Sequence, residues 1–143
     1  KAAGLKIGVY FFSQALSMDE ADQEIEYMLG ILGDYRLDMP IILDWEIPAS
    51  DARTANMDAR TLTDIQLYFC EKMKGLGYQP MVYFNWHQSE NLYYLSELED
   101  FPFWLALYQD RMRYPWKVEM WQYTCTGRVP GINGDVDINV YMP

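Results

Sequence analysis

The sequence predicts an α/β fold built on a parallel sheet. Apolar, β-rich runs alternate with amphipathic segments of helical period, and these runs are apolar enough to be buried on both faces of a sheet. With 143 residues, half of them apolar, the chain fits one domain that can bury a sizeable core. No internal repeat, low-complexity tract or linker divides it.

The first strand and helix are indicated by a change of hydrophobic period. Residues 6–12 form a continuous apolar run, as expected of a buried strand. Ser17 and Glu20 then have the spacing of a capping box, with Ser17 as N-cap and Glu20 at the third helical position. Apolar residues recur at helical spacing from there, and we expect the helix to end near Gly33.

The second strand and helix follow the same logic. Residues 40–45 form the second strand, and the polar segment 47–57 reads as a loop. The next helix should end at Gly77, and one of its faces is apolar through Leu62, Ile65, Phe69, Met73 and Leu76.

The remaining elements are shorter. We expect strands at 79–84, 103–108, 118–124 and 135–140, a short helix at 89–98 and a loop at 127–134. The last three strands have no room for full helices between them.

Two carboxylates stand at the end of the second strand. Asp44 and Glu46 are spaced i, i+2, so they project to the same face of a strand. Paired acids raise one another's pKa, which keeps one carboxyl protonated near neutral pH for general acid catalysis, as in glycoside hydrolysis. The alternative is an ordinary polar strand end. Phe12, Trp86 and Tyr108 also fall at carboxyl ends of strands, where parallel barrels carry their chemistry.

Composition excludes several other functions. A net charge of −10 provides no basic footprint for nucleic acid or anionic membranes, and no apolar run approaches the ~20 residues that span a bilayer. Cys70 and Cys125 have no metal-ligand spacing and are expected to be free thiols. With His87 as the single histidine, we predict no metal and no cofactor, and any catalysis must rest on carboxylates.

Several sequence blocks together resemble family 25 of the glycoside hydrolases, the lysozymes of the type found in Chalaropsis fungi, bacteria and phage endolysins. The similarity covers essentially the whole chain, with strand blocks at 7–12, 80–83 and 104–108 in the family's order. The blocks that carry most of it are the strand 40–46, Trp121-Gln122-Tyr123-Thr124, Gly131-Ile132-Asn133-Gly134 and Val136-Asp137-Ile138-Asn139.

The resemblance implies an irregular TIM-like β/α barrel and muramidase activity, the hydrolysis of the β-1,4 bond between N-acetylmuramic acid and N-acetylglucosamine. The substrate would be peptidoglycan glycan strands, and the place of action extracellular or the cell wall. Glu46 matches the family's general acid, Asp44 its partner and Asp137 a third acid of the cleft. The implied sugar-binding residues are Tyr10, Tyr83, Trp104, Tyr108 and Gln122, and Phe12 is added because it falls at a strand end. For the aromatic residues the alternative is packing beneath the cleft.

The chain also departs from the family pattern. Family members carry a Gly-(Ile/Val)-Asp-x-Ser strand, a second strand and a helix ahead of the block that starts here at Lys1. Six strands are expected against the family's eight, so residues 1–143 are expected to form a partial catalytic domain whose barrel lacks the first two strands. Such a barrel exposes two sheet edges and its inner face. We therefore expect self-association through these edges, or inactivation by truncation.

Two alternative functions stay open at this stage. A non-catalytic module that binds cell-wall glycan could use the same fold, because a fold does not fix a function. The retention of both Asp44 and Glu46 favours the enzyme. A carbohydrase of another family with a D-x-E strand, such as a family 18 chitinase, is a weaker alternative that the blocks after Trp121 disfavour.

Overall fold

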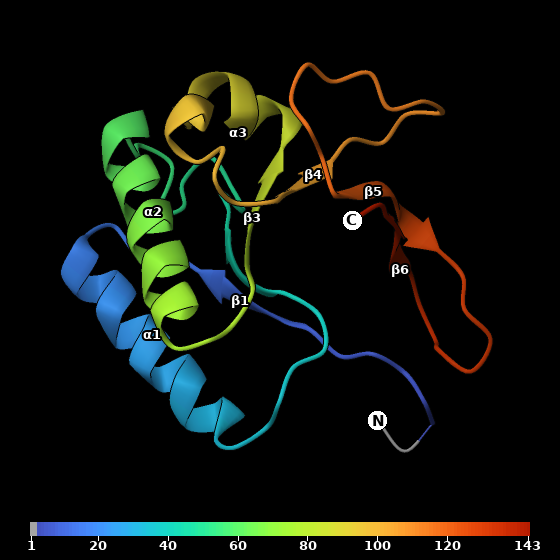
Figure 1. Ribbon diagram of the computed structural model, residues 1–143. Helices are drawn as coiled ribbons and strands as arrows, with labels where there is room; N and C mark the ends of the chain where they lie inside the picture. Colours follow the sequence, from blue (N-terminus) through green and yellow to red (C-terminus); the bar gives the residue numbers. More distant parts are fainter. Residues whose placement is uncertain (1–2) are drawn as a thin grey trace.

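The computed structural model describes residues 3–143 and contains one curled sheet (Figure 1). Its six strands lie side by side in the order in which they occur along the chain. They are β1 (Val9–Ser13), β2 (Ile41–Trp45), β3 (Pro80–Asn85), β4 (Phe103–Ala106), β5 (Met120–Gly127) and β6 (Val136–Tyr141). The sheet therefore forms a half-barrel, as expected of an incomplete barrel.

Two long helices cover the outer face of the first strands (Figure 1). They are α1 (Met18–Leu32) and α2 (Ala59–Gly75). The predicted N-cap of α1 is confirmed, since the Glu20 N–H donates to Ser17 Oγ at 3.2 Å, but the Glu20 carboxylate accepts from the Leu16 N–H rather than closing back on Ser17. The Asp58 side chain caps α2 by accepting from the Thr61 N–H.

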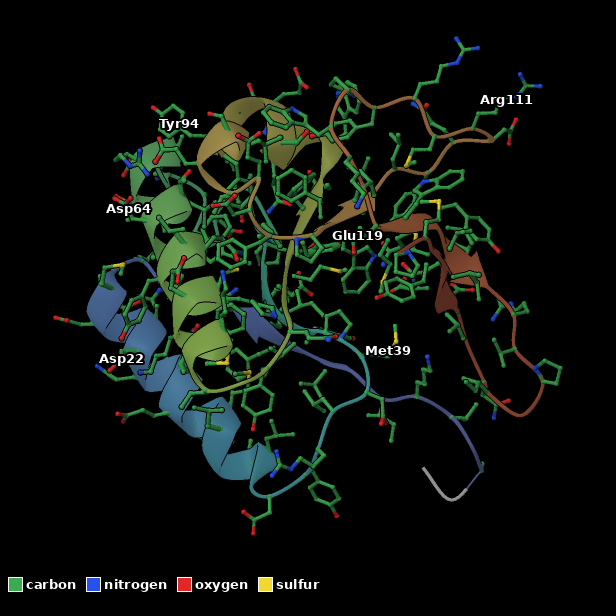
Figure 2. All side chains as sticks on the ribbon, in the orientation of Figure 1. Asp22, Met39, Asp64, Tyr94, Arg111 and Glu119 are labelled. Atoms are coloured by element: carbon green, nitrogen blue, oxygen red, sulfur yellow. The ribbon has the colours of Figure 1, made fainter. Side chains whose placement is uncertain are left out.

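The main core lies between these helices and the sheet. Its largest fully buried side chains include Trp45, Phe69 and Phe84. Figure 2 shows side chains filling the space between the helices and the strands, while Asp64 lies on the outer side of α2. The helical periods that the sequence predicts thus place their apolar faces on the sheet.

The prediction of a parallel sheet is confirmed for the first five strands and wrong for the last. The four pairs from β1 to β5 are parallel, whereas β6 runs antiparallel to β5. The connection at 128–135 is too short for a crossover, which takes about a dozen residues, so β6 folds back as a hairpin. Strand ends otherwise differ from the prediction by up to three residues.

The short helix predicted at 89–98 is divided in two. The structure has α3 (Trp86–Asn91) and a separate 3₁₀ turn η1 (Leu95–Glu97). The earlier start has a local cause, because Asn85 and Gln88 form a capping box immediately after β3. His87, which precedes the predicted helix, is therefore on α3.

The inner face of the half-barrel is open. A small buried cluster of Ile42, Met81, Tyr83 and Ala106 fills part of it. On the edge strand β1, however, the side chains of Tyr10 and Phe12 are 61% and 45% exposed. Among the described residues, β1 and β6 each have a neighbour on one side only, so the predicted exposure of two edges is confirmed. None of the described helices is long and apolar enough to cross a membrane.

Self-association through these edges stays a prediction. The Val9 N–H donates to the C=O of Pro40, which immediately precedes β2, so alternation leaves the backbone groups of Tyr10 and Phe12 facing the free side. We expect light scattering after size exclusion to give a mass above the 16.9 kDa of one chain, rising with concentration. Phe12→Lys should lower that mass. A mass of one chain at every concentration would contradict the prediction.

Candidate active site

The predicted site residues converge at the carboxyl ends of the strands, on the inner face. A pocket of about 210 Å³ is lined by Tyr10, Asp44, Glu46, Tyr83, Trp104, Tyr108, Gln122 and Asp137. Phe12 does not line it, although it pairs with Asp44 in the β1–β2 register. A larger pocket of about 600 Å³ lies at the opposite end of the strands, where parallel barrels do not place their catalytic groups.

Asp44 and Glu46 reach the pocket because of strand alternation. Asp44 is on β2, and Glu46, two residues later, is the first residue after the strand ends at Trp45. Both side chains therefore face inward. Trp45 between them points outward, is completely buried and donates from Nε1 to the Ala15 C=O at 2.9 Å. Because the Trp45 side chain is fixed on the outer face of the sheet, the side chains of Asp44 and Glu46 must lie on the inner face.

The electrostatic perturbation is centred on Asp44. Burial raises its pKa to about 7, with further contributions from the negative charges of Glu46 and Asp137. Its Oδ1 atom is buried and has no hydrogen-bond partner within the described residues. An ionised oxygen there would be uncompensated, so the protonated form is favoured up to neutral pH. The predicted effect of Glu46 on its partner is therefore present in the raised pKa of Asp44, as a smaller contribution than burial.

Tyr83 connects the acids to the aromatic wall. Its hydroxyl donates to Glu46 Oε1 at 3.1 Å, and burial together with the nearby charges of Glu46 and Asp44 raises its pKa well above the usual range. The Tyr83 ring meets Trp104 edge to face, with centroids 4.9 Å apart. Tyr83 thus stays a neutral hydrogen-bond donor and a rigid part of the wall.

The other walls come from β1, β4, β5 and β6. The Tyr10 ring contacts Trp104 at a centroid distance of 6.3 Å, and Trp104 Nε1 donates to Asn139 Oδ1 at 2.8 Å. The Tyr108 hydroxyl donates to Gln122 Oε1 at 2.6 Å, and its pKa is raised to about 12, first by burial and then by Cys125. These contacts orient polar tips and ring faces around the acids.

Three residues around the site were not predicted from the sequence. Thr54, Gln66 and Gln88 donate to backbone carbonyls at the end of β2, those of Glu46, Leu43 and Trp45. Gln66 carries a detectable signal, because it is a polar residue on the apolar face of a predicted helix. Gln88 carried none, because the predicted helix began after it.

The other chemistry-bearing residues do not line the pocket. His87 is exposed on α3 and contacts Asn91. Cys70 is a buried free thiol and Cys125 an exposed one. Within residues 3–143, no cluster of three His, Cys, Asp or Glu side chains suits a metal ion.

Comparison with known sequences decides the family. The sequence profile of the glycosyl hydrolases family 25 matches residues 1–132. The chain belongs to this family. The match ends before Asp137, so the assignment of that residue rests on the resemblance of its block and on its position in the pocket.

Three similar proteins are longer than this chain. The uncharacterized protein YegX of Escherichia coli K12 is 29% identical over 147 residues, which cover 96% of this chain and 48% of YegX. The CTP1L endolysin is 25% identical with a TM-score of 0.79, covering 99% of this chain and 48% of its own. The autolysin LytC of Streptococcus pneumoniae is 25% identical with a TM-score of 0.81, covering 98% and 35%. The chain therefore spans about half or less of the length of these relatives.

Proposed function

We propose that the chain is a peptidoglycan hydrolase of the muramidase type, cleaving the β-1,4 bond between N-acetylmuramic acid and N-acetylglucosamine. The observation that carries the proposal is the convergence of Asp44, Glu46 and Asp137 with an aromatic wall in one small pocket. Two of the structural relatives are named as an endolysin and an autolysin, which agrees with a glycan substrate in the cell wall. The place of action would then be the cell wall, outside the cytoplasm.

Glu46 acts as the general acid in this proposal. It lies one residue beyond the end of β2, nearer the rim of the half-barrel than Asp44, so it is placed to reach a glycosidic oxygen. Burial and the neighbouring charges of Glu46 and Asp137 raise the pKa of Asp44 to about 7, so Asp44 retains a proton up to about neutral pH. Asp44 thus keeps a proton next to Glu46 and limits the negative charge beneath the sugar.

Asp137 serves the opposite side of the reacting sugar. It comes from β6, across the pocket from β2, and is one of the charges that perturb Asp44. A carboxylate placed there stabilises the positive charge that develops on the sugar ring when the glycosidic bond breaks. Tyr10, Tyr83, Trp104 and Tyr108 would then hold the sugar by stacking and by hydroxyl contacts, and Gln122 orients Tyr108.

Product analysis tests this function directly. Purified peptidoglycan is digested with the chain, reduced with borohydride and examined by mass spectrometry. A muramidase leaves N-acetylmuramic acid at the new reducing ends, so we expect muramitol-terminated products and none from an E46Q variant. Reduced glucosamine ends would contradict the assigned bond.

The same assay separates the enzyme from a binding module. If the chain sediments with insoluble peptidoglycan but releases nothing at any pH, residues 1–143 act as a binding module and not as an enzyme. E46Q provides the comparison, because an enzyme without its acid should still sediment with the substrate.

A further inference from the structure

The pairing of β2 with β3 stops short of the acids. The last registered pair is Leu43 with Val82, although β2 continues to Trp45 and β3 to Asn85. On its other side, β2 stays paired with β1 as far as Trp45. The two strands therefore diverge where their side chains reach the catalytic pocket.

The side chain of Gln88 occupies this divergence. Its Oε1 accepts from the Asn85 N–H of β3 at 2.8 Å, and its Nε2 donates to the Trp45 C=O of β2 at 2.6 Å. Gln88 is 2% exposed, so solvent does not replace either bond. Its amide thus takes the place of a missing rung between the two strands.

The divergence of β2 and β3 also affects the distance between Glu46 and Tyr83. Glu46 comes from the end of β2 and Tyr83 from β3, and the 3.1 Å contact between Tyr83 Oη and Glu46 Oε1 spans the divergence from the inner side. Thr54 and Gln66 also hold carbonyls at the end of β2, but the Gln88 amide is bonded to both strands. The length of this bridge therefore fixes the spacing between the acid and its tyrosine.

We propose that Gln88 is a positioning residue, whose amide bridges β3 and β2 and holds the strand end bearing Asp44 and Glu46 at the correct distance from Tyr83. This inference rests on the proposed muramidase reaction for its kinetic consequence. Its structural part, the bridge itself, is independent of that reaction.

Helix capping is the alternative role, and one substitution separates the two. Gln88 stands at the third position of α3, where a glutamate caps as well as a glutamine by accepting from the N-cap N–H. Gln88→Glu therefore keeps the cap. When ionised, the introduced carboxyl loses the donor to the Trp45 C=O; when protonated, it regains it.

The kinetic experiment compares Gln88→Glu with the wild-type chain on soluble glycan at pH 5 and pH 8. At pH 8 we expect kcat to fall about 100-fold with KM unchanged, since a displacement of about 1 Å costs that much. At pH 5 the kcat of Gln88→Glu should recover to within about threefold of the wild-type value. Gln23→Glu, on the exposed face of α1, provides the same charge change and should match wild type at both values. If the kcat of Gln88→Glu divided by that of the wild-type chain is the same at pH 5 and pH 8, the proposal is wrong.

A second measurement does not depend on activity. Carbon-13 NMR titration of the Asp44 carboxyl measures the pKa of Asp44 whether or not the chain is catalytically active. In Gln88→Met both bonds of the bridge are lost, water reaches the pocket, and the raised Asp44 pKa should fall by about one unit or more. An inactive wild-type chain with this shift would refute muramidase activity and support the bridge. An unchanged Asp44 titration in a folded Gln88→Met variant would refute the bridge.

Discussion

Replacing Glu46 with glutamine is expected to reduce kcat for peptidoglycan cleavage about 1000-fold. Glutamine keeps the shape of the side chain and a carbonyl acceptor for the Tyr83 hydroxyl, but it has no proton to give to the leaving oxygen. Loss of a general acid costs ~100- to 10,000-fold, and binding should be little affected because the pocket walls are unchanged. Initial rates of reducing-end release and co-sedimentation with peptidoglycan measure the two quantities.

Glu26→Gln is the matched control for this experiment. Glu26 is exposed on α1, so its replacement removes the same charge far from the pocket and should leave kcat unchanged. Asp44→Asn should retain more activity than E46Q, because Asp44 lies deeper and acts through its partner. If the order is reversed, the proton donor is Asp44 and the assignment of roles is wrong.

Replacing Asp44 with asparagine is expected to stabilise the fold at alkaline pH. The Asp44 pKa rises from 3.8 to about 7 on folding, so the protonated carboxyl favours the folded state. Its contribution is complete below pH 3.8 and is lost as the pH rises through about 7. The shift corresponds to at most about 4 kcal/mol, which residual solvent contact reduces to about 2 kcal/mol at pH 8.

Thermal unfolding at pH 4 and pH 8 checks this expectation. Asparagine resembles the neutral acid, so Asp44→Asn should match wild type at pH 4 and melt about 4–8 °C higher at pH 8. Asp51→Asn, in the exposed loop after β2, should show no such difference between the two pH values. An Asp44→Asn variant that is less stable than wild type at pH 8 would show that the ionised carboxylate is compensated. Stability given up at a catalytic acid is a common feature of enzymes.

Most of the fold could be predicted because its signals are local. The helical periods of α1 and α2, the N-cap at Ser17 and the apolar runs of the strands each depend on residues within a few positions of one another. The direction of β6 was missed because it depends on how the chain turns after β5, which periodicity does not report. The start of α3 was missed because its cap, Asn85, also ends a strand.

Most of the residues that line the pocket could be predicted from the sequence for a related reason. In a parallel sheet the carboxyl ends of the strands converge, so side chains at those ends meet whatever the intervening sequence is, and Asp44, Glu46 and Tyr108 were predicted in this way. Tyr10, Tyr83 and Asp137 were expected only from the family resemblance, and they line the same pocket. Phe12 also falls at the carboxyl end of a predicted strand, but it does not line the pocket. Its position depends on the curl of the sheet, which a strand pattern does not specify.

The sequence by itself determined the family, the order of strands and helices, and the placement of Asp44 and Glu46 on one face of β2. Periodicity, caps and residue blocks are properties of the chain alone. Only the tertiary structure decided that the raised pKa belongs to Asp44, and that a buried amide from α3 joins β2 to β3 beneath the pocket. Burial and hydrogen bonding between distant segments are set by packing, because each depends on what the rest of the molecule places against a side chain.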